Sequence, residues 1–156
     1  ASPDKLDKCL ELGADFAVDH RKEDWHKEVR AISKELAKKK GEAPGIDLSF
    51  DHIGETHWNQ QLQLLKYGAT LVSCGATTGY NAKTDLRHVF FKGTNILGST
   101  QGTKAELDQA LYWMGQGKIK AAIDSTYTFE QAAEAHTKML TGKGLFGKIL
   151  MKPEGA

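Results

Sequence analysis

Three short apolar runs in the sequence each end in small or polar residues whose backbone groups could touch a flat ligand. The runs end at residues 51–54 (DHIG), 73–77 (SCGAT) and 97–100 (LGST). Glycine, serine and threonine at such positions leave backbone N–H and C=O groups accessible. Ligands of parallel α/β sheets bind at the carboxyl ends of the strands, so the pattern predicts a ligand site there. Ordinary strand-to-helix turns use the same residue types, and that alternative stays open.

The sequence offers no recognisable acid–base, nucleophilic or metal-binding constellation. Its six histidines show no HExxH spacing, and Cys9 and Cys74 form no CxxC pair. We therefore predict no catalytic residue and no metal site in the chain. Both cysteines are expected to be small core residues in a reducing cytoplasm.

Composition excludes several classes of partner. The 156 residues carry a net charge of +1 and are 40% hydrophobic, which predicts a folded chain without a global field for nucleic acid or anionic membrane. No apolar run approaches the length of about 20 residues that spans a bilayer. The lysines at 38–40 are either a solvated helix end or a phosphate patch.

Strand and helix patterns alternate along the chain. Short apolar runs predict strands at residues 16–18, 46–50, 71–74, 94–98 and 147–151. Helical periodicity and caps predict a helix from Ser2-Pro3 to Gly13, one that starts at residues 23–24, and helices at 55–67, 85–92 and 129–140, with another opened by a Thr103–Glu106 capping box. This alternation predicts an α/β fold with a mainly parallel sheet.

Several motifs, read in order, add a more specific indication. They are ELGAD (11–15), DHIG (51–54), LKYG (65–68), CGATTG (74–79), DLRHVFFK (85–92), ILGST (96–100), EQAAEAH (130–136) and FGKIL (146–150). Together they resemble the C-terminal portion of the medium-chain dehydrogenase/reductase superfamily. The branches that they resemble are the zinc-dependent alcohol dehydrogenases and the quinone oxidoreductases.

The resemblance implies a partial Rossmann domain. The glycine-rich GxGxxG phosphate loop of the family does not occur, and neither do its first two strands or its catalytic, GroES-like lobe. We expect a doubly wound, mainly parallel sheet over residues 1–100 and a tail of the catalytic lobe over 101–156. Because the two absent strands separate the third from the fourth, residues 16–18 are expected to be unpaired, re-paired or contributed to another chain.

Matching positions in the family imply a set of cofactor-binding residues. Ser2 and Lys5 would lie on the adenosine side, where Lys5 could contact a 2′-phosphate, although a helix cap and a surface lysine are equally good interpretations. Asp51 could instead be a satisfied turn carboxylate, and Lys148 a strand-edge lysine. The complete predicted set is Ser2, Lys5, Asp51, His52, Cys74, Gly75, Ala76, Thr77, Leu97, Gly98, Ser99 and Lys148.

The function implied is NAD- or NADP-dependent hydride transfer involving a small alcohol, aldehyde or quinone. Zinc, if it is used, would be held by the full-length protein, and the 156 residues alone are expected to be inactive. We expect a cytoplasmic homo-oligomer, a dimer or tetramer paired through residues 94–98. The alternative is a catalytically silent Rossmann-like module for binding or oligomerisation. A methyltransferase would fit the fold but not the CGATTG and ILGST motifs.

Overall fold

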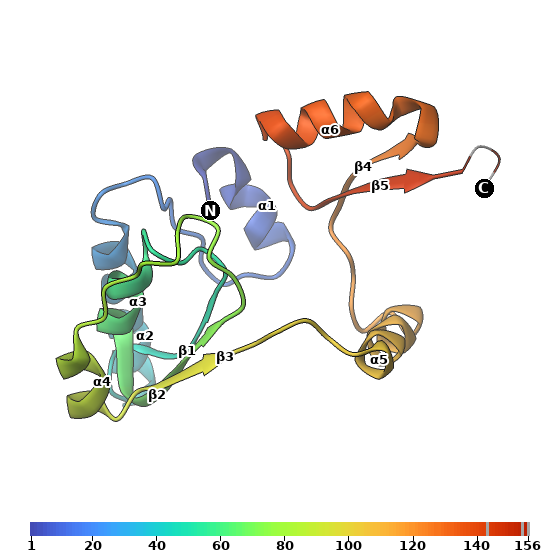
Figure 1. The fold of residues 1–156 in the computed structure, drawn as a ribbon. Helices are drawn as coiled ribbons and strands as arrows, with labels where there is room; N and C mark the ends of the chain where they lie inside the picture. Colours follow the sequence, from blue (N-terminus) through green and yellow to red (C-terminus); the bar gives the residue numbers. More distant parts are fainter. Residues whose placement is uncertain (143, 154, 156) are drawn as a thin grey trace. The chain divides into compact units, whose positions relative to one another are not determined.

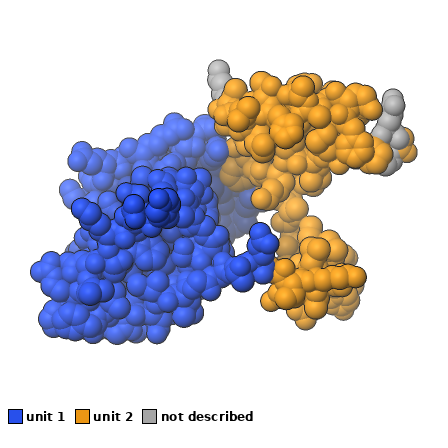
Figure 2. Space-filling model, in the orientation of Figure 1, with its two compact units in different colours: residues 1–101 blue, residues 102–156 orange. Residues whose placement is uncertain are grey.

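The computed structural model describes residues 1–142, 144–153 and 155. The chain divides into two compact units, unit 1 over residues 1–101 and unit 2 over residues 102–156 (Figure 1, Figure 2). Each unit contains its own sheet. The predicted boundary after residue 100 lies next to this division, whereas the return of the second part to a catalytic lobe stays a prediction. Across the described residues, no helix combines the length and apolar character needed to cross a membrane.

Unit 1 is built on a three-stranded parallel sheet. The strands β1 (Ile46–Asp51), β2 (Leu65–Ser73) and β3 (Asn95–Gly98) lie in the order β1-β2-β3. Both pairings are parallel. The prediction of an α/β fold with a mainly parallel sheet is therefore confirmed.

The helices α2 (Trp25–Lys40), α3 (Trp58–Leu64) and α4 (Leu86–Lys92) bury the core of unit 1. Helix α3 contacts α2, α4 and β2. The apolar cluster between α3 and β2 consists of Leu62, Leu65, Ala69 and Leu71, of which Leu62 and Leu71 are fully buried. This burial fixes β2 as the central strand, because it is the one whose side chains the helices cover.

The opposite face of the same sheet stays open in unit 1. In register, Phe50 on β1 lies beside Val72, and Val72 lies beside Leu97 on β3, so the three side chains share one face. Phe50 is 65% exposed and Leu97 53%. Parallel strands are usually covered on both faces, and here one face lacks its cover within unit 1.

The helix predicted over residues 55–67 is shorter than expected, since α3 ends at Leu64 and residues 65–67 begin β2. The cause is a contact from a distant part of the chain. The Lys92 ammonium donates to the carbonyl oxygens of residues 62, 63 and 65 at 3.3, 2.9 and 2.8 Å. Burial lowers the pKa of Lys92, and the charge of Arg30 adds to that effect. The Lys92 ammonium thus satisfies the carbonyl groups at the end of α3 that the N–H groups of a further helical turn would otherwise bind.

The strand predicted at residues 16–18 forms no ladder. The chain begins instead with a 3₁₀ turn, η1 (Pro3–Lys5), followed by the short helix α1 (Leu6–Glu11). The amino group of Ala1 donates to the carbonyl of Val18 at 2.8 Å, and His20 N–H donates back to the Ala1 carbonyl at 3.1 Å. Residues 16–18 are therefore unpaired as a strand, one of the outcomes expected from the resemblance.

Unit 2 contains α5 (Lys104–Gly115), β4 (Ile123–Thr128), a 3₁₀ turn η2 (Phe129–Gln131), α6 (Ala132–Thr141) and β5 (Lys148–Lys152). The predicted capping box is present: Glu106 accepts from Thr103 N–H at 2.6 Å, and the Thr103 hydroxyl accepts from Glu106 N–H at 3.3 Å. Strand β4, which pairs in parallel with β5, was not predicted. Its polar sequence, IDSTYT, does not read as an apolar run.

A buried carboxylate ties the elements of unit 2 together. Asp124 on β4 forms an ion pair with Lys138 on α6, and it accepts from Phe146 N–H at 2.9 Å and from the Ser125 hydroxyl at 2.8 Å. Lys138, the largest influence, and the two other donors hold the pKa of Asp124 well below its ordinary value of 3.8. One side chain thus links β4, α6 and the segment that enters β5.

Replacing this carboxylate should destabilise unit 2 in a pH-dependent way. We expect Asp124→Asn to lower the unfolding temperature at about pH 7, because Lys138 loses its partner. The folded-state pKa is depressed, so the contribution is complete above 3.8 and declines as the pH falls toward the folded-state value. Thermal unfolding with hydrogen exchange of the amides of β4 and β5, at about pH 7 and about pH 3, measures this difference. Asp108→Asn on α5 is the matched control, and an equal effect of both variants would contradict the assignment.

Candidate functional site

The carboxyl ends of β1, β2 and β3 meet at one edge of unit 1. Asp51 pairs in register with Ser73, and Ser73 pairs with Gly98. Backbone hydrogen bonds continue this order past the strands, with Cys74 N–H donating to the Asp51 carbonyl and Ser99 N–H to the Ser73 carbonyl, both at 2.8 Å. We call residues 51–54, 73–79 and 97–99 the strand-end shelf. The three predicted segments therefore form one continuous surface.

The Asp51 side chain is the buried anchor of the shelf, with 2% of its surface exposed. Its carboxylate accepts from Ile53 N–H and Gly54 N–H, both at 3.1 Å, and from the Gln61 amide of α3 at 2.7 Å. The other end of that amide accepts from the Ser49 hydroxyl at 2.6 Å. These bonds favour the turn-carboxylate alternative over direct contact between Asp51 and a ligand.

A second set of bonds joins the loop after β1 to the loop after β2. The His52 carbonyl accepts from the Thr77 hydroxyl at 2.8 Å, and the Ile53 carbonyl accepts from Thr78 N–H and the Thr78 hydroxyl, both at 2.8 Å. The Thr78 hydroxyl also accepts from Thr56 N–H at 3.2 Å. Thr78 was not among the predicted residues, although it is the fifth position of the noted CGATTG motif. The two loops are consequently one rigid piece.

Gly54 allows the two loops to approach this closely. Its φ of +87° is in the left-handed region, and a Cβ there would lie 2.6 Å from the Gly79 carbonyl oxygen and 2.9 Å from Ala76 Cα. Neither contact is sterically possible for a side chain. Glycine at this position is thus required by the geometry of the shelf.

The outer surface of the shelf is open and consists mainly of small side chains and exposed backbone groups. The predicted residues that are exposed there are His52, Cys74, Gly75, Ala76, Thr77, Leu97, Gly98 and Ser99. In the described part of the chain, the amide N–H groups of Gly75 and Ala76 have no acceptor. A Cβ on Gly98 would meet nothing within 4 Å, so the space above this residue is empty. Backbone donors without an acceptor and an uncovered glycine are features that a ligand at the carboxyl ends of the strands could use.

A half-buried histidine lies beside the shelf. His57, at the start of α3, stacks edge-on against Trp25 at 5.1 Å and His20 at 5.8 Å between ring centroids. Burial, and then the neighbouring His20, lower the pKa of His57. Its Nδ1 atom is buried and has no partner in the part of the chain that the structure describes. The indole of Trp25 covers His57, which is why this histidine is half-buried.

Three predicted site residues lie elsewhere. Ser2 is buried in the N-terminal turn, where its hydroxyl binds Asp4 and lowers the pKa of that carboxyl. Lys5 ends η1 and is half-exposed. Lys148 lies on β5 in unit 2 and is exposed. Their participation in the same site as the shelf stays a prediction. Searched over the described residues, no group of three His, Cys, Asp or Glu side chains is arranged to hold a metal.

Removing the charge of Asp51 should weaken unit 1 as well as the shelf. Asp51→Asn presents an NH₂ group to a donor, so we expect the free energy of unfolding to fall by about 1–3 kcal/mol. Asp47→Asn on the same strand is the control, because the Asp47 side chain is 80% exposed and pairs with Lys66 at 2.9 Å. Such a surface pair contributes about 1 kcal/mol or less. Urea unfolding of the variants measures both values, and equal losses would refute the anchoring role.

Comparison with known proteins identifies the family of the chain. The family of zinc-binding dehydrogenases matches residues 12–151. Human (Homo sapiens) quinone oxidoreductase is 31% identical over 81% of this chain and 39% of its own length. Crotonyl-CoA reductase of Streptomyces collinus is 27% identical over 99% of this chain and 37% of its own. The crystal structure of an NAD-dependent alcohol dehydrogenase superposes with a TM-score of 0.80 at 31% identity, covering 97% of this chain and 42% of that one.

The chain thus spans about two fifths of the length of these relatives. The family match covers most of the chain and includes all three strand ends of the shelf. The chain therefore belongs to the zinc-binding dehydrogenase family of the medium-chain dehydrogenase/reductase superfamily and corresponds to its C-terminal portion.

Proposed function

We propose that the chain supplies the nicotinamide-side wall of an NAD(P)-dependent oxidoreductase. The observation that supports this most directly is the open shelf, which has the unpaired N–H groups of Gly75 and Ala76 on one loop and the uncovered Gly98 at the end of β3. The substrate that we propose is a small alcohol, aldehyde or quinone. The likeness to a crotonyl-CoA reductase adds an activated carbon–carbon double bond as a further candidate.

The proposed work of these residues is to orient a ring rather than to react. A bound nicotinamide would supply or receive the hydride. The two amides would donate to its carboxamide, and Gly98 would let the ring face lie close to β3. The carbonyl pattern fixed by Asp51 would hold this geometry before the ligand binds, which lowers the ordering cost of binding. The side chains exposed on the shelf include no carboxylate. A proton donor for the substrate is accordingly proposed to lie outside the shelf.

Zinc and self-association stay proposals. The described residues offer no set of metal ligands, so a zinc ion, if the enzyme uses one, would be held by residues outside this chain. Pairing between two copies through β3 is consistent with its position at an edge of the sheet and with exposed Ile96 and Leu97. A cytoplasmic location also stays a proposal. The expectation that both cysteines are core residues is wrong, because Cys9 is half-buried and Cys74 is exposed.

The second candidate function is a catalytically silent Rossmann-like module that binds a partner or oligomerises. It is favoured by the open apolar face of the sheet, where Phe50 and Leu97 are more than half exposed. The family match favours the first candidate, because the matching family is one of dehydrogenases. We therefore rank it second.

Titration of the chain with reduced nicotinamide mononucleotide tests the proposed function. We expect weak binding, on the order of millimolar, because the chain offers one wall of a site. Backbone NMR shifts of Gly75, Ala76 and Ser99 should move. Gly98→Val should reduce this affinity at least about tenfold, or 1.4 kcal/mol, by filling the space above β3.

Asn95→Val places the same side chain at the other end of the same strand and should leave the affinity unchanged. Adenosine monophosphate is the ligand control and should not shift the shelf amides. No shift with the nicotinamide nucleotide would favour the silent module. The chain alone should show no turnover, whereas its coding sequence should carry a GxGxxG loop within about 180 upstream residues if the enzyme is of the proposed kind.

Lys5 provides a separate test of cofactor choice. If its ammonium binds a 2′-phosphate in the complete enzyme, Lys5→Glu should weaken the binding of NADPH by about tenfold more than the binding of NADH. The reason is that the substitution replaces a charge-assisted hydrogen bond to the phosphate with a repulsion between two negative charges. Lys38→Glu, in the exposed last turn of α2, makes the same charge change as a control. Dissociation constants from nicotinamide fluorescence decide the matter. Equal weakening of both cofactors by Lys5→Glu would leave Lys5 as a surface lysine.

A further inference from the structure

Four cationic side chains line a groove at the amino end of the sheet of unit 1. The groove has a volume of about 450 Å³ and lies between α2, the end of α3 and the start of β2. This volume is within the range of pockets that hold small molecules. We call it the basic groove, and its defining residues are Arg30, Lys34, Pro44, Lys66, Tyr67 and Lys92.

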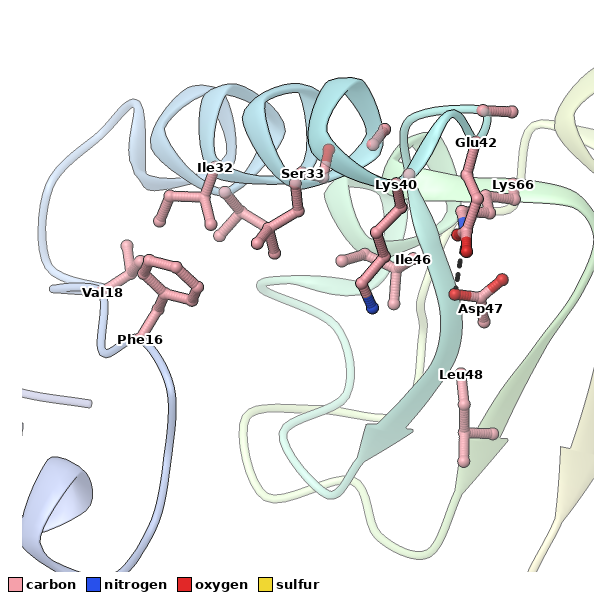
Figure 3. A pocket seen from close by; sticks show the side chains of 15 residues that line it. Phe16, Val18, Ile32, Ser33, Lys40, Glu42, Ile46, Asp47, Leu48 and Lys66 are labelled. Carbon is pink, nitrogen blue, oxygen red and sulfur yellow. Dashed lines mark hydrogen bonds and ion pairs between the residues drawn. The ribbon is translucent and has the colours of Figure 1, made fainter.

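The basic groove carries an excess of positive charge. None of the described residues that line it is an aspartate or a glutamate. Lys66 is compensated from outside the groove, since it pairs with Asp47 at 2.9 Å and with Glu42 at 3.5 Å (Figure 3). The other three cations form no ion pair in the part of the chain that the structure describes. Because the whole chain has a net charge of +1, this excess is local to the groove.

Two of these cations are held close together by one carbonyl group. The Gln63 carbonyl oxygen accepts from the Lys92 ammonium at 2.9 Å and from the Arg30 guanidinium at 3.4 Å. The ammonium donates to three carbonyl groups in all, so Lys92 contributes charge to the groove but no free donor. Burial, and then the positive charge of Arg30, lower the pKa of Lys92. The two cations thus repel each other, and a nearby anion would offset that repulsion.

Arg30 and Lys34 can supply the donors for such an anion. They lie one helical turn apart on α2, and both residues are exposed. A guanidinium has five N–H groups, and Arg30 uses one of them on Gln63. Within the described residues, the Lys34 ammonium has no partner. A guanidinium and an ammonium at this spacing suit the oxygens of a carboxylate or a phosphate.

The rest of the wall of the basic groove is apolar. It consists of Ala43, Pro44, Leu64, Leu65 and Tyr67. Tyr67 is 81% exposed, so its ring is available to cover a ligand. Release of water from such a wall favours an occupant with apolar surface. A bare inorganic ion would leave the wall in contact with water, whereas an anion with an apolar body would cover it.

We propose that the basic groove binds a small organic anion whose carboxylate or phosphate head contacts Arg30 and Lys34 and whose apolar body covers Pro44 and Tyr67. The shelf lies at the carboxyl ends of the same strands, so the two sites are separate. Strand β2 has nine residues at about 3.3 Å each, which places its two ends roughly 25 Å apart. A small ligand cannot reach both ends, and the proposal does not require that a nicotinamide cofactor binds.

Titration of the 156-residue chain with 1-naphthyl phosphate and with 1-naphthoate tests this proposal. We expect dissociation constants of about 1 mM or below. The backbone NMR signals of Ala43, Gly45 and Leu65 should shift, whereas those of Gly75 and Ala76 on the shelf should not. Raising the ionic strength from about 0.02 M to about 0.5 M should weaken binding several-fold, because salt screens exposed charges. The ligand that binds more tightly identifies the preferred head group, and no shift of the groove signals with either ligand would overturn the proposal.

Lys34→Gln should weaken the binding of both ligands at least about tenfold, because it removes a charge-assisted hydrogen bond. The residue is exposed, so the variant should fold. Lys27→Gln is the matched control, since it removes the same charge two turns earlier on α2 at an exposed residue that does not line the groove. It should bind both ligands as the parent does. Equal losses with Lys34→Gln and Lys27→Gln would show a general attraction to positive charge and would contradict the proposed site.

Two ligand controls separate the head from the body. 1-Naphthol lacks the charge and inorganic phosphate lacks the apolar body, so each should bind at least about tenfold more weakly than 1-naphthyl phosphate. If 1-naphthol bound as tightly, the cations would have no role in the site. If inorganic phosphate bound as tightly, the apolar wall would have none. Either result would refute the proposal.

Discussion

The buried carboxylate of Asp51 is the constraint on which the geometry of unit 1 depends. It takes up two backbone N–H groups of the turn that follows β1 and the amide of Gln61 on α3. An unpaired polar group at 2% exposure is costly, so these three bonds are strongly preferred together. Their result is a turn whose carbonyls point toward β2. The loop after β2 is held in place because its amides and threonine hydroxyls donate to the carbonyl groups of His52 and Ile53.

The same residue connects the shelf to the hydrophobic core. Gln61 is followed by Leu62, which is fully buried against Leu71 of β2. Displacing the turn after β1 would therefore rotate or shift α3, and the helix is further held at its other end by the Lys92 ammonium. A shelf fixed in this way can present two unpaired N–H groups to a ligand without collapsing onto itself. Preorganised donors of this kind are what a binding wall needs.

Sequence alone was sufficient where a pattern is local. The Thr103–Glu106 capping box and the three strand ends are set by neighbours within a few residues, and the structure has all of them. It was insufficient where a distant contact decides. Residues 65–67 continue a helical pattern, but pairing of Leu65 with Ile46 on β1 and the bond from Lys92 to the Leu65 carbonyl make them the start of β2. Strand β4 was missed because its polar residues are held by Asp124 and by pairing with β5 rather than by apolar burial.

In the candidate site, too, local features could be predicted from the sequence and features set by distant contacts could not. The glycines and small residues of the shelf could be found from the sequence, since strand ends of parallel sheets have a recognisable composition. The role of Asp51 could not be decided, because a turn carboxylate and a ligand-binding carboxylate have the same sequence signature. Only its burial and its three donors distinguish them. Thr78 is visible in the sequence only as a second threonine in the motif. Its role could not be predicted, because its hydroxyl donates to the Ile53 carbonyl in a different loop.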